Sequence, residues 1–207
     1  MVQSRSEETR NRVLDATREL LMAHGFNELT MKHVQEKSGI SNGSIFHHFG
    51  SKEGIVREIF IEERRLYLGA IADAIVHHEG DPCDAFAAGA RRAVDYQLQD
   101  IERFMRLVAD FSDSEWLRAN KELWLDAAND IQRPVVEWAM PHFASGALPL
   151  LPPTVFQSLS LGPAEFITRS QRQGRIENAL EHVDSLAAAI GAGLKHLRDL
   201  QAETQPT

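Results

Sequence analysis

The stretch Leu29–Val56, LTMKHVQEKSGISNGSIFHHFGSKEGIV, decides how this chain folds. Thr30 is a good N-cap for one short helix and Ser41 for the next. Gly39 stands between the two and can adopt the positive φ that a tight turn needs. Two short helices joined in this way are typical of a helix-turn-helix, whose second helix enters the major groove of DNA. The stretch therefore predicts a DNA-binding element.

The second of these helices carries the side chains that such a role requires. Ser41, Asn42 and Ser44 place short hydrogen-bonding groups at its N-terminal end, and Gly43 lets the backbone come close to bases or phosphate. Lys52, in the first turn of the following helix, offers a cation to the phosphate backbone.

The charge of the chain limits where DNA could bind. The 207 residues have a formal net charge of −8, and a polyanion needs Lys and Arg near its phosphates. Residues 1–55, however, hold seven Lys and Arg and seven Asp and Glu, so all of the excess negative charge lies beyond them. A DNA-binding face must therefore be local to this first quarter. Arg5, Arg10 and Arg12 could follow a DNA groove or only keep a loose terminus hydrated.

Cysteine usage and hydropathy indicate the compartment. The single cysteine, Cys83, excludes an intramolecular disulfide framework, and the chain does not open with the charged and apolar segments of a secretory signal. Charges interrupt every apolar stretch before it reaches the roughly 20 residues that a membrane helix needs. We therefore expect a cytoplasmic protein with no membrane partner.

The whole chain predicts an all-α fold, because apolar residues recur at intervals of three and four rather than two almost everywhere. The first helix is expected to end at Gly25, which suits a left-handed cap. Pro134 and Pro141 are expected to kink or divide the helical region after Ser114. The remaining helices are expected over residues 51–78, 82–98, 101–111, 154–173 and 181–201, with a loop at 145–153.

Over Thr30–Val56, and more loosely over Arg10–Phe60, the sequence resembles the TetR-type one-component regulators of bacteria. The shared pattern is threonine, helix, a small-Gly-hydrophobic-Ser turn, an aromatic residue, His-Phe, and then Ser-Lys-Glu. The resemblance implies a helix-turn-helix DNA-binding domain over 1–54, a connecting helix from about 51 to 78, and a helical ligand-binding and dimerisation domain over 55–207. It implies a ligand-responsive transcriptional regulator, usually a repressor that a small molecule releases from a palindromic operator.

The same resemblance assigns the residues that contact DNA. Lys32 and Asn42 are expected nearest the base edges, whereas the other positions contact base, phosphate or the DNA backbone. The full set is Thr30, Lys32, Asn42, Gly43, Ser44, Phe46, His47, His48 and Lys52. Two positions depart from the family pattern: Phe46 lacks the hydroxyl of the usual tyrosine, and Gln35 replaces a small residue.

Several of these assignments have simpler alternatives. Phe46 could belong to the core, as Phe49 is expected to do, and His47 and His48 could be hydrated surface groups. A helical small-molecule-binding protein that has lost its operator would fit the acidic balance. An enzyme is disfavoured, because the chain lacks a phosphate-binding glycine loop, a Gly-x-Ser-x-Gly elbow and a His-Glu-x-x-His helix.

The last two helices predict the interface of a homodimer, since a lone helix-turn-helix has a small footprint and such proteins usually bind two half-sites. Both helices carry an apolar stripe, flanked in the last one by small residues that permit close approach. The stripes could instead pack inside one chain. The predicted interface residues are Phe156, Leu159, Phe166, Ile167, Val183, Leu186, Ala187, Ile190 and Leu194.

Aromatic residues gather in the middle of the chain and predict a pocket for a small apolar or aromatic ligand. Most of them must be ordinary core. The predicted ligand residues are Phe104, Val108, Phe111, Trp116, Trp124 and Trp138. No cofactor is expected, and no metal, because the adjacent pair His77 and His78 lacks the i, i+4 spacing of a shared helical site.

Overall fold

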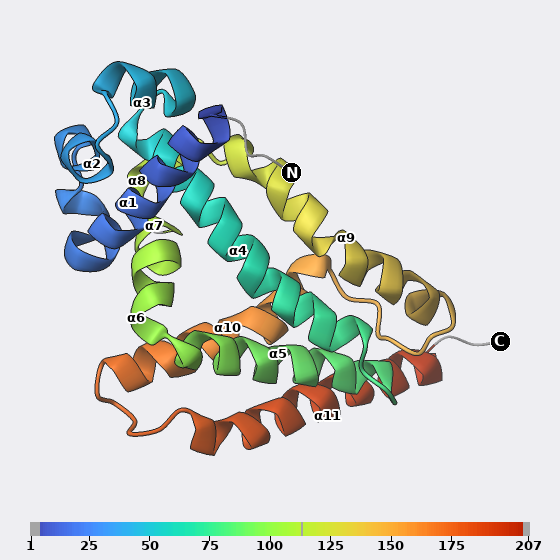
Figure 1. The fold of residues 1–207 in the computed structure, drawn as a ribbon. Coiled ribbons are helices and arrows are strands. Elements are labelled where there is room, and N and C mark those ends of the chain that lie inside the picture. The colour runs from blue at the N-terminus through green and yellow to red at the C-terminus, as the bar shows by residue number, and fades with distance from the viewer. Residues whose placement is uncertain (1–4, 113, 205–207) are drawn as a thin grey trace. The chain divides into compact units, whose positions relative to one another are not determined.

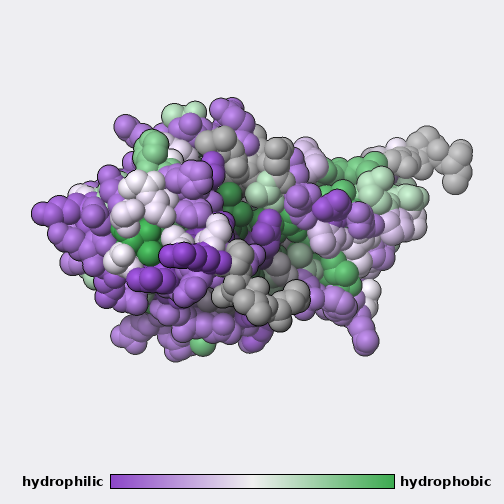
Figure 2. Space-filling view, turned by 45° about the horizontal axis from the view of Figure 1, so that its top comes forward, coloured by the Kyte–Doolittle hydropathy of each residue, from purple (hydrophilic) through white to green (hydrophobic). Residues whose placement is uncertain are grey.

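The computed structural model describes residues 5–112 and 114–204, with the side chains of 123–126 and 128 left out of the description. Every regular element within these ranges is a helix, so the all-α prediction is confirmed (Figure 1). No helix in the described part of the chain is long and apolar enough to span a bilayer. Hydrophilic side chains cover most of the face drawn in Figure 2, and hydrophobic ones emerge between them in patches.

The chain divides into two compact units. Unit 1 comprises Met1–Arg65 and Glu102–Ala127, and unit 2 comprises Leu66–Ile101 and Ala128–Thr207. The sequence predicts a boundary after residue 54, but the structure places it later. Ile55 and Ile59 have no exposed surface, and a return segment supplies Phe111, whose ring contacts Phe60. Sequence patterns could not assign that return segment, because its partners lie about fifty residues earlier.

Unit 1 is built on three N-terminal helices: α1 (Arg5–Glu28), α2 (Met31–Ser38) and α3 (Asn42–Phe49). Gly25 kinks α1 with a φ of 76° and a ψ of 175°; the predicted positive φ is confirmed, but the helix continues to Glu28 instead of ending at this glycine. The return segment contains α6 (Ile101–Phe104), the π-helical turn η1 (Met105–Ala109), α7 (Asp110–Ser112) and α8 (Glu115–Ala119). η1 and α7 pack against α1.

Helix α4 (Lys52–Val76) and helix α9 (Glu122–Ala144) each contribute residues to both units. Pro134 and Pro141 lie inside α9, so of the two predicted effects, a kink or a division of the helix, the division does not occur. Both prolines are exposed, so water can hydrate the carbonyl that each leaves without a donor. The break falls instead at Asn120, which ends α8 by donating from Nδ2 to the Trp116 carbonyl at 2.8 Å.

Unit 2 is centred on α5 (Pro82–Gln99), which packs against α10 (Pro153–Arg172) and α11 (Leu180–Thr204). Asp81 caps α5 by accepting from the Cys83 backbone N–H at 2.9 Å. Glycines allow α5 to lie close to its neighbours: a Cβ at Gly89 would come within 2.8 Å of Ile75. The buried amide of Gln97 is satisfied internally, since its Nε2 donates to the Tyr67 hydroxyl at 2.8 Å.

Candidate DNA-binding helix and ligand cavity

The turn between α2 and α3 is built by local hydrogen bonds. Thr30 Oγ1 accepts from the His33 backbone N–H at 3.2 Å, and Ser41 Oγ accepts from that of Ser44 at 3.3 Å. Gly39 has a φ of 66° and donates its N–H to the Gln35 carbonyl at 3.0 Å. Both predicted N-caps and the predicted turn glycine are therefore confirmed, and Gln35 is tolerated at its exposed position on α2.

Helix α3 has one buried face and one exposed face. Ile45 is fully buried and Phe49 is 8% exposed, so both belong to the core of unit 1. Phe46 is 65% exposed, which excludes the alternative that it is a core residue. Asn42, Gly43 and His47 share the exposed surface, and Ser44 and His48 are half-buried. The residues of α3 that are predicted to contact DNA thus lie on the face and flanks of this helix that the core does not use.

Arginines of α1 hold the helices beneath this face. Arg12 donates from a guanidinium nitrogen to the Ser38 carbonyl at 2.8 Å, beside the turn. Arg10 forms an ion pair with Glu58 of α4 and lies 5.9 Å from the centre of the Phe49 ring. Both side chains therefore have structural partners in unit 1 and do more than hydrate a terminus.

The two predicted lysine contacts differ in how free they are. Lys32 is 79% exposed and lies 3.8 Å from Glu36 on the same helix, an arrangement worth little in water. Lys52 Nζ lies 4.6 Å from the centre of the Phe26 ring and 3.5 Å from the Phe26 carbonyl oxygen. Its ammonium is thus held against α1, and only Lys32 extends into solvent.

Gly54 is a structural residue that the sequence analysis missed. A Cβ at this position would lie 2.0 Å from the Phe49 carbonyl oxygen, a backbone atom that cannot move aside cheaply. Gly43 differs, because a Cβ there would meet nothing within 4 Å. A glycine directly after the Ser-Lys-Glu cap was the only available signal for the close approach at Gly54.

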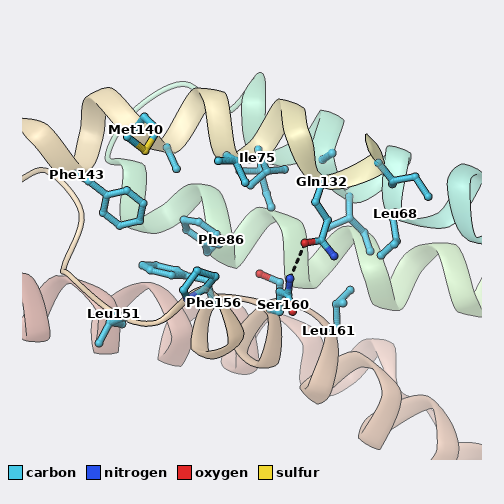
Figure 3. A pocket seen from close by; sticks show the side chains of 18 residues that line it. Leu68, Ile75, Phe86, Gln132, Met140, Phe143, Leu151, Phe156, Ser160 and Leu161 are labelled. Carbon is cyan, nitrogen blue, oxygen red and sulfur yellow. Dashed lines mark hydrogen bonds between the residues drawn. The ribbon is translucent and has the colours of Figure 1, made fainter. Parts of the chain in front are cut away.

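Unit 2 contains an apolar cavity of about 240 Å³ between residues of α4, α5, α9 and α10 (Figure 3). Its wall includes three phenylalanine rings: Phe86 and Phe156 have centroids 4.6 Å apart, and Phe143 and Phe156 have centroids 5.5 Å apart. Exposed Val136 and Met140 line it as well.

The only polar side chains in the wall are Gln132, Gln157 and Ser160. Gln157 Nε2 donates to Gln132 Oε1 at 2.6 Å, the dashed contact in Figure 3. Ser160 is 5% exposed, and its Oγ has no hydrogen-bond partner. No charged side chain lines the cavity among the residues that the structure describes.

None of the predicted ligand residues with a described side chain lines this cavity. Phe104, Val108 and Phe111 are buried in unit 1, where the Phe111 ring stacks on Trp116 with centroids 5.8 Å apart. Trp138 lies in unit 2 with its ring centroid 6.0 Å from that of Phe86. The side chain of Trp124 is outside the described residues. The cavity therefore points to a ligand set that the sequence analysis did not identify.

The predicted dimer stripe is divided by the fold. Four of its members are buried within unit 2, four are half-buried, and Phe166 is 68% exposed. The buried members are Phe156, Val183, Ile190 and Leu194; the half-buried ones are Leu159, Ile167, Leu186 and Ala187. Four further exposed apolar residues on the same two helices lie outside the predicted interface set: Val155, Leu180, Leu197 and Leu200.

Metal-binding groups do not converge in the part of the chain that the structure describes. His77 Nδ1 lies 3.0 Å from an Asp73 carboxylate oxygen, and both side chains are exposed. Cys83 is buried as a free thiol, and burial together with the Asp81 carboxylate raises its pKa to about 11.

Comparison with known proteins places the helix-turn-helix in a family. Residues 13–59 match the model of the bacterial regulatory proteins of the tetR family. The HTH-type transcriptional regulator UidR of Escherichia coli K12 is 32% identical over 74 residues, which are 36% of this chain and 38% of UidR. The matched part thus spans well under half of that relative.

Solved structures extend the similarity of fold to most of the chain. A TetR family transcription regulator from Marinobacter aquaeolei VT8 superposes with a TM-score of 0.64 at 19% identity, covering 91% of this chain and 96% of that one. A structure described as a SmeT–triclosan complex gives a TM-score of 0.57 at 16% identity, covering 88% and 91%. At these identities the likeness concerns the fold alone.

Proposed function

Because the chain belongs, through its N-terminal helix-turn-helix domain, to the bacterial TetR family of transcriptional regulators, we propose that it binds an operator in duplex DNA and represses transcription there. The observation that carries the proposal is the exposed face of α3, where Asn42, Gly43, Phe46 and His47 are free of core contacts. Such a face fits the major groove, in which short polar side chains contact base edges.

The roles within this face follow from chemistry and exposure. Asn42 stands in the first turn of α3 and offers an amide that pairs with adenine, and Lys32 offers a mobile cation to bases or phosphate. Thr30, Ser44, His47 and His48 supply phosphate contacts, and Phe46 packs on the sugar-phosphate backbone. Lys52 contributes through its field, since its ammonium is held beside Phe26.

We propose further that the protein acts as a homodimer. The exposed apolar residues of α10 and α11, led by Phe166, Leu197 and Leu200, form the contact with a second copy. Small residues such as Gly193 stand on the same flank of α11 and would permit close helix packing. A dimer would present two copies of α3 to two half-sites about 34 to 36 Å apart.

The cavity of unit 2 supports control by a small molecule. Helix α4 supplies Ile55 and Ile59 to the core of unit 1 and Leu68 and Ile75 to the cavity wall. A ligand in the cavity would therefore contact the helix that follows α3 directly in the chain. If the ligand favours one of two dimer states, it shifts the spacing of the two α3 helices and releases the operator. A neighbour in fold, SmeT, is described in complex with triclosan.

The test is a band shift with the DNA upstream of the chain's own gene, comparing the native protein with Gly43→Ala. No atom of the protein opposes a Cβ at Gly43, and alanine is the better helix former, so the variant should melt at the same temperature or higher. Its affinity for the operator should nevertheless fall about tenfold, because the added methyl group prevents close approach to DNA. Unchanged affinity would contradict the proposed face.

Asn42→Ala and Lys32→Ala separate base contact from charge. Asn42→Ala should alter sequence preference by about 1–3 kcal/mol at one base pair, whereas Lys32→Ala should reduce the salt dependence of all binding. A protein that binds the cavity's ligand but no DNA at modest ionic strength would instead be a helical binding protein that has lost its operator.

A further inference from the structure

We propose that the ligand of the unit 2 cavity is an uncharged, largely apolar molecule with one hydrogen-bonding group, and that Ser160 binds this group. The inference rests on the proposed function only in taking the cavity as the place where a ligand acts. It identifies the chemical class of that ligand and the side chain that selects it.

The described residues of the wall carry no charge, and this selects a neutral ligand. The lining residues are aliphatic, aromatic or uncharged polar, as Ile75, Phe86 and Phe156 illustrate in Figure 3. A carboxylate or an ammonium group would lose its hydration on entry and meet no side chain of opposite charge, which is strongly unfavourable. A neutral apolar molecule meets no such penalty and gains from leaving water.

Among the described residues of the wall, Ser160 has the one buried polar side-chain atom that lacks a hydrogen-bond partner. Other hydroxyls of α10 bond back to the helix: Ser158 Oγ donates to the Thr154 carbonyl at 2.8 Å, and Thr168 Oγ1 to the Ala164 carbonyl at 2.8 Å. Ser160 Oγ is buried and makes no such bond. Because buried polar groups are nearly always paired, this hydroxyl is suited to a partner that arrives with a ligand.

The amide pair in the wall does not compete for this role. Gln132 and Gln157 already bond to each other between α9 and α10, and Gln157 is exposed. Ser160 is more deeply buried than either, in the neighbourhood of Phe86 and Phe156 (Figure 3). A ligand oriented by Ser160 would therefore have its polar group inside and its apolar body along the rings.

The size of the cavity limits the ligand to about the dimensions of a bicyclic aromatic molecule. An apolar cavity of about 150 Å³ holds benzene, and the present one measures about 240 Å³. Naphthalene and its derivatives are therefore suitable probes, since a single ring system can carry no polar group, a hydroxyl, a carboxylate or an ammonium.

The experiment is a fluorescence or calorimetric titration of the full chain with 2-naphthol, naphthalene, 2-naphthoate and 2-naphthylmethylammonium. We expect the affinity for 2-naphthol to exceed that for either charged probe by about tenfold or more. Ser160→Ala should lower the affinity for 2-naphthol about fivefold to tenfold and leave that for naphthalene within about twofold. Ser158→Ala, the same change on an exposed position of the same helix, should alter neither.

Each outcome decides one statement. Equal affinity for a charged probe overturns the neutral class, and an unchanged preference for 2-naphthol in Ser160→Ala overturns the role of the serine. If operator DNA is shifted but no probe binds, the inference fails while the proposed function survives. If the probes bind as expected but no DNA is shifted, the inference stands and the proposed function fails. A melting curve for Ser160→Ala equal to that of the native chain confirms that the variant is folded.

Discussion

Two aromatic clusters of this molecule look alike in composition and differ in what they do. The Phe111 cluster (Phe26, Phe60, Phe111 and Trp116) belongs to unit 1, and the Phe111 ring lies 5.2 Å from that of Phe26 and 5.3 Å from that of Phe60. The Phe156 cluster (Phe86, Phe143 and Phe156) belongs to unit 2 and lines a cavity. The rings of the Phe111 cluster pack mainly on one another, whereas those of the Phe156 cluster border a cavity. Aromatic content therefore indicates burial, and only packing tells a core from a binding site.

The sharpest test of this difference compares the central ring of each cluster. Phe111 is 1% exposed and surrounded by three rings, so Phe111→Ala should lower the free energy of unfolding by about 3–5 kcal/mol. Phe156→Ala should cost about 1–2 kcal/mol less, because part of that ring already faces a space with no atoms to lose. Urea unfolding measures both. Equal losses would mean that the two clusters are packed alike.

Filling the cavity tests whether the space beside the Phe156 cluster is the binding site. Ala139 is buried and lines the cavity, so Ala139→Phe should place a ring in it and reduce the affinity for 2-naphthol about tenfold or more. The free energy of unfolding should change by no more than about 1–2 kcal/mol, since the added ring has room. Ala144→Phe, at an exposed position of the same helix, is the matched control and should leave binding intact.

A smaller effect is expected on the side of α5 that faces α11. Burial raises the pKa of Asp81, but hydrogen bonds from Arg198 and the Cys83 N–H, with the charge of Arg198, lower it more, so the net pKa lies below 3.8. Asp81→Ala should therefore cost about 1 kcal/mol at pH 7, as for the loss of an N-cap.

The pH dependence of this cost follows from the direction of the shift. A carboxyl group whose folded pKa is depressed stabilises the fold fully above its unfolded pKa, and that stabilisation is lost as the pH falls through the folded pKa. The difference between native protein and Asp81→Ala should thus shrink as the pH drops below 3.8. Asp199→Ala, which removes an exposed partner of Arg198, should change the free energy of unfolding little, both at pH 7 and below pH 3.8.

The smallest effect concerns the thiol beside this cap. With its pKa raised to about 11 by burial and the Asp81 carboxylate, Cys83 should carry almost no thiolate at pH 8. Iodoacetamide should then modify the folded chain very slowly and the urea-unfolded chain at an ordinary rate. Rapid alkylation of the folded protein would show that the Cys83 thiol is accessible to solvent and that the packing of α5 against α11 does not protect it.

Local chemistry explains why the DNA-binding element could be predicted from residues alone. Thr30, Gly39 and Ser41 form their bonds with groups a few positions away, so their roles are visible in the sequence. The inward face of α3 follows from the spacing of Ile45 and Phe49. The choice between surface and core for Phe46 did not follow, because one aromatic residue beside a stripe is compatible with either.

The cavity and the division into units could not be predicted in this way. Whether a ring such as Phe111 or Phe156 fills its surroundings depends on helices from distant parts of the chain. Periodicity shows that a face is buried but not what covers it, and it therefore could not identify the residues that line the cavity of unit 2.

The sequence by itself determined that every regular element in the described ranges is a helix, where the helix-turn-helix begins and ends, and that residues 13–59 match the tetR family of bacterial regulatory proteins. Those properties rest on bonds and patterns within a few residues. The tertiary structure alone decided that residues 102–127 return to unit 1, that Ser160 is left without a partner, and that a cavity remains beside it. These depend on how well side chains from several helices fill the volume between them, a quantity that no short segment contains.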